Sequence, residues 1–334
     1  MTDLKAPFPY FGGKSSIASA VWSALGQPKH YIEPFFGSGA ALLLRPNYDP
    51  KAHVETVNDA DGHIANVWRA LQADPDAVAK VCDWPVNHAD LMARKKRINE
   101  RTESLLSSLV ADDKFYDVET AGYWIWAASC WIGNGLVSPN QRPRLSDGGN
   151  GVHALGQIPE IGTSGKGVHA AYAPSHYEWF RCLSERLRRV RVVCGDWSRV
   201  CVGDWQTGIG TCGMFFDPPY GVAANRDSRL YAVDSLTVAD DIRAWCLNRG
   251  DDPKMRIVFA GYFEEHESLL SHGWRVQQWK AQGGYGNLGD GIGKENRHRE
   301  ALFFSPHCVG RGLFDEVIAD EEIPIDPVQA VVDR

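Results

Sequence analysis

The residues with the most specific chemistry are Asp217-Pro218-Pro219-Tyr220, which directly follow the apolar run at 213–216. An amine on an aromatic ring is a weak nucleophile because its lone pair is delocalised into the ring. A carboxylate and a backbone carbonyl that accept its hydrogen bonds draw the nitrogen toward tetrahedral geometry, so the lone pair can attack a methylsulfonium. The two prolines fix φ near about −65° and hold these acceptors in place, while Tyr220 offers a flat face for a base. Taken alone, the four residues also fit a rigid turn capped by Asp217.

A glycine turn nearer the N-terminus adds a candidate nucleotide site. The run 33–39, EPFFGSG, joins a short apolar strand to a turn in which Gly37 and Gly39 let the backbone approach a ligand closely. Asp59 lies 20 residues beyond Gly39 and ends a second strand. An acid in this place binds ribose hydroxyls in dinucleotide sites and in S-adenosylmethionine sites. These features therefore do not distinguish a nicotinamide cofactor from S-adenosylmethionine.

The run 7–14, PFPYFGGK, is a second glycine turn that opens a helix. Its backbone N–H groups and the Lys14 ammonium can bind a carboxylate, and the methionine moiety of S-adenosylmethionine carries one. A plain helix start with a surface lysine fits the same residues equally well.

The elements that position these residues alternate as in a nucleotide-binding α/β sheet. We expect strands near residues 31–36, 53–59, 190–194, 213–216, 256–262, 274–279 and 299–304, and helices near 15–25, 40–44, 64–71 and 179–187. Residues 85–130 are predicted to be helical. The run 133–169 is rich in Gly, Pro, Ser and Asn and shows no periodicity, which is typical of a functional or disordered loop.

Composition indicates a globular protein of the cytoplasm. The 334 residues are 44% hydrophobic, and we find neither a run of about 20 apolar residues that would span a membrane nor a signal peptide. The eight cysteines are scattered without a C-x-x-C pair, which favours reduced, mostly buried thiols over a zinc site.

The net charge of −7 is unevenly distributed. The tail from Asp315 holds seven acidic residues and one arginine, and its composition predicts disorder. Basic clusters occur at 94–97 and 186–191, where they fit either contact with phosphate or a solvated helix face.

The ordered set PFPYFGGK, EPFFGSG, VND, CGDW and FDPPY resembles the D12-type (Dam-like) DNA N6-adenine methyltransferases, in their alpha motif order. The chain also looks like adenine methylases often carried by phages and other mobile elements. The resemblance runs with gaps from about residue 7 to residue 305, and Asn134-Gly135-Leu136 looks like the family segment that leads into a recognition hairpin. The Gly-Ser-Gly turn departs from the glycine run of many relatives.

The resemblance implies an α/β fold, a Rossmann-like S-adenosylmethionine-dependent methyltransferase sheet with an inserted helical and loop-rich target-recognition domain. Residues 1–84 and 176–308 would form the catalytic methyltransferase domain. Residues 85–175 would be the target-recognition insert, and 309–334 an acidic, disordered tail.

The resemblance also assigns residues to the site. It implies cofactor contacts by Tyr10, Gly13 and Lys14 at the methionine end, by Glu33, Phe35, Gly37 and Gly39 in the turn, by Asp59 at the ribose, and by Asp196 and Trp197 at the adenine. The turn Asp217-Pro218-Pro219-Tyr220 would hold the target base. Candidates for DNA contact in the middle loop are Asn134, Arg142, Arg144, Lys166 and His169, each of which also fits an ordinary surface loop. We expect Trp124, Trp126 and Trp131 to be core residues.

The implied activity is site-specific transfer of a methyl group from S-adenosylmethionine to N6 of an adenine flipped out of double-stranded DNA, with no metal and, by default, by a monomer. A cytosine-N4 methyltransferase is the nearest alternative, although such enzymes usually carry serine in place of Asp217. An RNA adenine methyltransferase typically has asparagine there. From other classes, a nucleotide-dependent oxidoreductase leaves the Asp-Pro-Pro-Tyr turn unexplained, and a non-catalytic DNA-binding relative has no need of Asp217.

Overall fold

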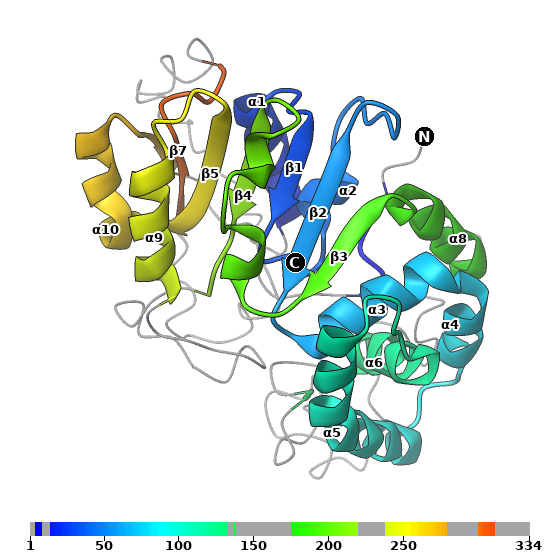
Figure 1. The fold of residues 1–334 in the computed structure, drawn as a ribbon. Helices are drawn as coiled ribbons and strands as arrows, with labels where there is room; N and C mark the ends of the chain where they lie inside the picture. Colours follow the sequence, from blue (N-terminus) through cyan, green and yellow to red (C-terminus); the bar gives the residue numbers. More distant parts are fainter. Residues whose placement is uncertain are drawn as a thin grey trace, which may run out of the picture.

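The computed structural model describes residues 4–8, 14–131, 136–137, 175–219, 238–278 and 300–310. These residues form one seven-stranded sheet that is flanked by helices on both faces (Figure 1).

The sheet has the strand order β3-β2-β1-β4-β5-β7-β6. The strands are β1 His30–Glu33, β2 Val54–Asp59, β3 Val190–Cys194, β4 Cys212–Phe216, β5 Met255–Tyr262, β6 Arg275–Gln278 and β7 Glu300–Phe304. The first five strands in this order run parallel, while β7 is antiparallel to β5 and β6. The expectation of an open, mostly parallel sheet is thus confirmed.

The strand order reverses between β1 and β4. From β1 the chain moves outward through β2 to β3, and it then returns to the other side of β1 to place β4 and β5. Ligands of open α/β sheets bind outside the carboxyl ends of the strands at such a switch point. The chain turns away after Glu33 because Pro34 has no N–H for a further ladder hydrogen bond.

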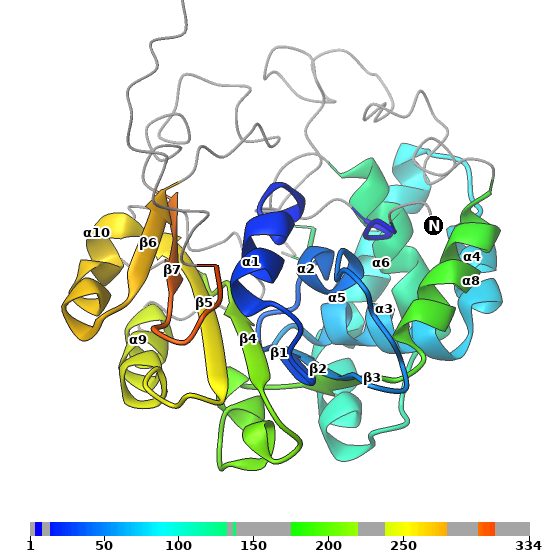
Figure 2. The same ribbon diagram turned by 90° about the horizontal axis from the view of Figure 1, so that it is seen from above.

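The helices cover the sheet on two sides, with α1 and α9 on opposite faces (Figure 2). The longer helices are α1 Ala18–Leu25, α3 Gly62–Ala73, α4 Pro75–Cys82, α5 His88–Ala111, α6 Val118–Cys130, α8 His176–Leu187 and α9 Val238–Arg249. Short ones are η1 Lys14–Ser16, α2 Ala40–Leu43, η3 Trp197–Val200, η4 Trp205–Thr207, α10 Phe263–His266 and η7 Glu267–His272.

Alternation along the strands creates two hydrophobic cores. In β4, Phe215 points into the core that includes α1, α3, α4 and α8, whereas Met214 and Phe216 point into the core that includes η3, α9 and η7. Successive strand side chains point to opposite faces, so an apolar strand such as this one is buried along its whole length. The catalytic candidate Asp217 follows a strand that is held from both sides.

Helices α5 and α6 extend the first core away from the sheet. Asn87 and Asp117 cap their N-termini by accepting hydrogen bonds from backbone N–H groups. Three tryptophans lie in or directly after α6 and are buried, as predicted: Trp124, Trp126 and Trp131. Side chains from both helices belong to the same hydrophobic cluster as those of α3, α4 and α8.

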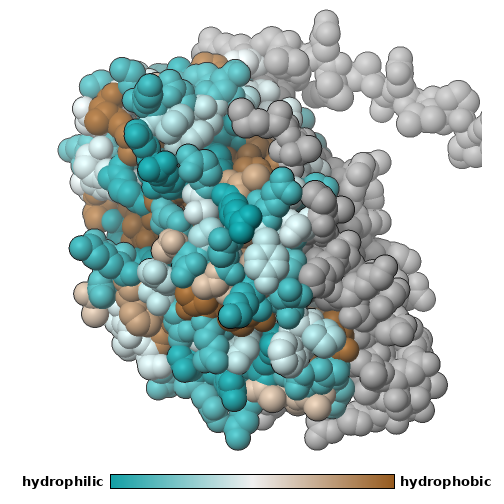
Figure 3. Space-filling view, turned by 90° about the vertical axis from the view of Figure 1, so that its right-hand side faces the viewer, coloured by the Kyte–Doolittle hydropathy of each residue, from teal (hydrophilic) through white to brown (hydrophobic). Residues whose placement is uncertain are grey.

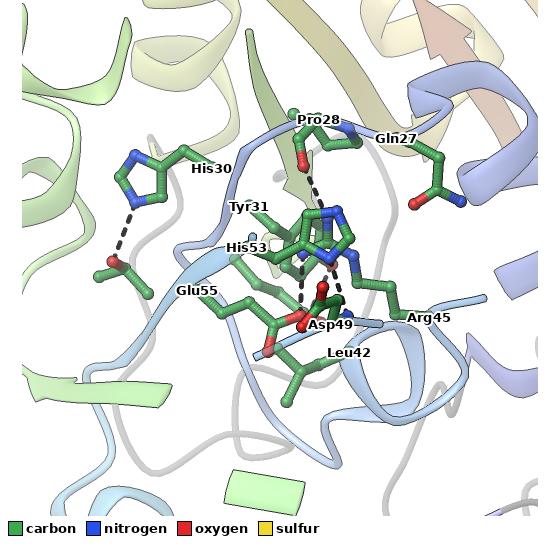
Figure 4. Close-up of polar contacts among 12 residues, drawn as sticks. Gln27, Pro28, His30, Tyr31, Leu42, Arg45, Asp49, His53 and Glu55 are labelled. Carbon is green, nitrogen blue, oxygen red and sulfur yellow. Dashed lines mark hydrogen bonds and ion pairs between the residues drawn. The ribbon is translucent and has the colours of Figure 1, made fainter. Parts of the chain in front are cut away.

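A buried ion network joins α8 to strand β2 and to the chain before β1. Arg45 donates to the Glu55 carboxylate at 3.0 Å and to the Pro28 carbonyl at 2.6 Å (Figure 4). Arg186 on α8 reaches the same carboxylate with two hydrogen bonds, of 2.7 and 3.0 Å. The side chains of Arg45 and Glu55 are fully buried, so loss of one partner would leave a buried charge unpaired.

The side of the molecule that carries α4 and α8 is mostly hydrophilic, with small and separated hydrophobic patches (Figure 3). Among the residues that the structure describes, no helix has the length and apolar character needed to cross a bilayer.

Arg69 ties helix α3 to two other elements. Its Nε donates to the Val192 carbonyl of β3 at 3.0 Å, and its Nη1 donates to the carbonyls of Leu109 and Asp112 at 3.1 Å each. One guanidinium thus fixes the end of α5 against the sheet.

We predict that Arg69→Met lowers the free energy of unfolding by about 2–4 kcal/mol, because it leaves several carbonyls in a largely buried place without a donor. Urea unfolding followed by circular dichroism measures this change. The matched control is Arg188→Met, since the Arg188 side chain is 74% exposed and pairs with Glu185 across the surface. Equal stability of the two variants would contradict the prediction.

Candidate functional site

Acidic side chains gather at the carboxyl ends of four neighbouring strands. Glu33 ends β1, Asp59 ends β2, Asp196 follows β3 and Asp217 follows β4. Because these strands are parallel and adjacent, the four acids lie along one edge of the sheet. Sequence analysis predicted all four as site residues, and the strand order places Glu33 and Asp217 at the switch point.

Asp217 pairs with Lys14, whose Nζ lies 3.1 Å from a carboxylate oxygen. The Lys14 side chain is 7% exposed and that of Asp217 is 21% exposed, so the pair is only slightly open to solvent. Burial raises the pKa of Asp217 above its ordinary value, and the Lys14 ammonium opposes that rise. Sequence analysis predicted Lys14 at the carboxylate of a ligand, and in the structure its ammonium pairs with the carboxylate of Asp217.

The turn after β4 is rigid where the structure describes it. Pro218 is buried and Pro219 is half-buried. Their rings fix φ at the two positions that follow Asp217 in the sequence. The fully buried strand β4 anchors the start of this turn. The orientation of the Asp217 carboxylate is therefore set by covalent geometry, by packing and by the ion pair with Lys14.

Glu33 is buried beside this pair. It accepts a hydrogen bond of 2.9 Å from the hydroxyl of Tyr31, which is itself fully buried. Burial raises the pKa of Glu33 well above its usual range, and the neighbouring Asp217 carboxylate adds to that rise. Sequence reasoning missed Tyr31, although its place two residues before Glu33 on one strand puts both side chains on the same face.

The glycine turn after β1 has a backbone conformation that favours glycine. Gly37 and Gly39 have φ of 47° and 63°, in the left-handed region that residues with a Cβ rarely adopt. A Cβ on Gly39 would also lie only 2.7 Å from the Phe36 ring. Trp68 donates to the Gly37 carbonyl at 2.9 Å and so holds the turn from α3.

Asp59 fixes this turn from the end of β2. Its carboxylate accepts from the Gly37 N–H at 2.8 Å and from the Asp61 N–H at 2.9 Å. Burial, with the nearby Asp61 charge, raises the pKa of Asp59 from 3.8 to about 7. Since a carboxylate offers about four acceptor positions, Asp59 can accept further hydrogen bonds from a ligand.

Asp196 and two aromatic residues complete this edge of the sheet. Asp196 is exposed and accepts from the Ser198 N–H at 2.9 Å at the start of η3. The Trp197 ring meets Phe216 edge-on at 6.3 Å, and Phe35 packs against the same cluster. An exposed acid thus lies beside half-buried aromatic rings, which suits a flat ring that carries an amine.

Part of the sequence prediction falls outside the described residues. This holds for Tyr10, Gly13 and Tyr220 and for the five DNA candidates, Asn134, Arg142, Arg144, Lys166 and His169.

All eight cysteines are free, and seven of them are buried. Within the described ranges, no group of three or more His, Cys, Asp or Glu side chains is arranged to hold a metal ion.

Comparison with known families matches residues 10–119 to the family described as D12 class N6 adenine-specific DNA methyltransferase. This span contains Lys14, Glu33, the glycine turn and Asp59, while Asp196 and Asp217 lie beyond it. The seven-stranded sheet with its antiparallel β7 agrees with a methyltransferase fold. The comparison with curated proteins found no match.

We predict that stability depends on the titration of Asp59. Between pH 3.8 and about 7 the folded protein keeps a proton on Asp59 that the unfolded chain has released. The free energy of unfolding should therefore fall as pH rises through this window, by about 2–4 kcal/mol, and Asp59→Asn should remove that part of the slope. Urea unfolding at several pH values measures it, with exposed Asp204→Asn as control. A slope that Asp59→Asn leaves unchanged would show that the Gly37 and Asp61 amides offset burial.

Proposed function

We propose that the chain methylates N6 of an adenine held against Asp217. The premise is that residues 10–119 match the family of D12 class N6 adenine-specific DNA methyltransferases. Members of this family use S-adenosylmethionine and act on DNA. The observation that carries the proposal is the meeting of Asp217, Glu33 and Lys14 at the switch point of the sheet.

The residues at this edge fit S-adenosylmethionine by their chemistry. Glu33 suits the ammonium of the methionine moiety, the remaining acceptor positions of Asp59 suit ribose hydroxyls, and Asp196 with Phe35 and Trp197 suits an adenine ring. The turn at Gly37 and Gly39 leaves the backbone bare for close approach. Bound here, the cofactor would supply a methyl group already activated by the positive sulfur.

Asp217 and a backbone carbonyl of the Pro218–Pro219 turn would accept the two hydrogen bonds of the adenine amine. S-adenosylmethionine held beside this amine would supply the methyl group, and one proton of the amine would leave to solvent. The rigid turn keeps both acceptors aimed without reorganisation. For this role Asp217 must be ionised, and Lys14 favours that form despite burial.

We assign double-stranded DNA as the substrate and residues 85–175 as the recognition insert between the parts of the catalytic domain, 1–84 and 176–308. A target amine inside a duplex is out of reach, so the adenine would be flipped into the site. Asn134, Arg142, Arg144, Lys166 and His169 remain the candidates for contact with DNA, and Tyr220 the candidate for stacking on the base.

Incubation with tritiated S-adenosylmethionine and unmethylated DNA, followed by digestion to nucleosides, tests the activity. We expect label in N6-methyldeoxyadenosine, reduced at least about a hundredfold in Asp217→Ala while cofactor binding is retained. Asp204→Ala is the matched control, because Asp204 is exposed and pairs with Arg249 away from the site. Label in N4-methyldeoxycytidine would overturn the choice of base, and DNA without label would overturn the activity.

We predict that Lys14→Met moves the acidic limb of the profile of kcat against pH upward by about one to three pH units. Loss of the ammonium raises the pKa of Asp217, so the carboxylate becomes protonated at a higher pH. The profile is measured at saturating cofactor and DNA. Lys14→Arg keeps the positive charge and should leave the limb near its original place; an unshifted limb in Lys14→Met would show that Lys14 does not govern Asp217.

A further inference from the structure

Asn58 links the loops that follow two different strands. It lies near the end of β2 with 1% of its surface exposed. Its Nδ2 donates to the Pro34 carbonyl at 3.0 Å and to the Gly195 carbonyl at 2.9 Å. Pro34 directly follows β1, and Gly195 directly follows β3. One side-chain amide therefore connects the carboxyl ends of three neighbouring strands.

Backbone hydrogen bonds around Asn58 support the same connection. The Asn58 carbonyl accepts from the Phe36 N–H at 2.9 Å, and the Asp59 carbonyl accepts from the Gly195 N–H at 3.0 Å. The loop after β1 is thus held by the side chain and the backbone of Asn58. The loop after β3 is held by its side chain and by the backbone of the next residue.

These two loops carry the residues that we assign to the cofactor. The loop after β1 contains Phe35 and Gly37, and the loop after β3 leads directly into Asp196 and Trp197. The hydrogen bonds of Asn58 fix the separation between the two loops. The place for an adenosine moiety between them is therefore set by this amide.

Asparagine is specifically required by this geometry. Both partners are carbonyls, so the side chain must present two donors from one short stem, and the two hydrogens of Nδ2 do so. Aspartate has the same shape but, when ionised, only accepts hydrogen bonds, and serine has one donor. Among the residues that the structure describes, the buried Oδ1 of Asn58 has no partner. An unpaired buried acceptor is unfavourable, which is consistent with a residue retained for its two donors.

We propose that Asn58 is a positioning residue for the cofactor, holding the loop of Phe35 and Gly37 and the loop of Asp196 and Trp197 at the separation that S-adenosylmethionine requires. This role rests on the proposed function, because it assigns to these loops the cofactor of that reaction. The loss of Asn58 should then weaken cofactor binding beyond what a loss of general stability explains.

The chain offers a matched control in Asn66. Asn66 is also fully buried, and its Nδ2 donates to the Asp117 carbonyl at 2.9 Å while its Oδ1 accepts from the Asp117 N–H at 2.7 Å. Both hydrogen bonds join α3 to the residue before α6, and neither involves a cofactor loop. Substitution to aspartate at both positions removes a buried amide donor in each case, but only Asn58→Asp affects the two loops.

The experiment is calorimetric titration of the full chain with S-adenosylmethionine, at a temperature well below the midpoint of thermal unfolding of every variant. We expect Asn58→Asp to raise Kd by roughly tenfold to a hundredfold, Asn58→Ser to have an intermediate effect, and Asn66→Asp to leave Kd unchanged. Thermal unfolding without cofactor measures the loss of stability for each variant. If Asn58→Asp does not fold, Asn58→Ser decides the comparison.

Two results would overturn the role of Asn58. One is an unchanged Kd in the Asn58 variants, which would make the residue purely structural. The other is an equal loss of affinity in Asn66→Asp, which would reduce the effect to general destabilisation. Failure of the unaltered protein to bind S-adenosylmethionine would instead overturn the proposed cofactor itself.

Discussion

The parallel pairing of β1 with β4 is the constraint on which the candidate site depends. Ile32 lies opposite Met214 in this pairing, so the chain beyond β1 and the chain beyond β4 emerge at the same edge. Glu33 and Asp217 are therefore neighbours although 183 intervening residues separate them in sequence. Every other part of the site is placed relative to these two strands, with β2 and β3 on one side and β5 on the other.

This arrangement concentrates negative charge in a place that disfavours it. Burial raises the pKa of Glu33, Asp59 and Asp217, which means that each carboxylate is less stable ionised here than in water. Lys14 offsets part of this cost at Asp217, and backbone N–H groups offset part of it at Asp59. A site built in this way favours a cationic ligand, and S-adenosylmethionine carries positive charge at its sulfur and at its ammonium.

Part of the sheet could be predicted because strands such as β3 and β4 are rich in apolar residues and end directly before Gly195 and Asp217. The run at 213–216 with Asp217 and two prolines is the clearest case, and it forms β4 followed by the candidate catalytic turn. Positions in the glycine turn were also predictable, since left-handed φ favours glycine. These features are local in the sequence, so a short window contains all the information that they need.

Contacts that depend on tertiary packing could not be predicted in this way. The partner of Lys14 follows from the packing of η1 beside the end of β4, which no local pattern records. The role of Asn58 needed the strand order, because its two carbonyl partners come after β1 and β3. The shifted pKa values needed burial and neighbouring charges together. Tyr31 is intermediate, since strand periodicity alone places it on the face of Glu33.

The chain is anchored on both sides of the segment between Trp131 and Ser175, and this affects which parts of the sequence can vary in evolution. On one side Trp131 is buried, and Lys95 lies over its ring and donates to the Leu136 carbonyl at 2.8 Å. On the other, His176 contacts the Ala79 carbonyl, and α8 is held to β2 through Arg186. Trp131 and His176 are thus held by residues that lie outside the segment between them. A lineage can therefore alter this segment and keep the contacts that fix its two ends, and with them the strands that position Glu33 and Asp217.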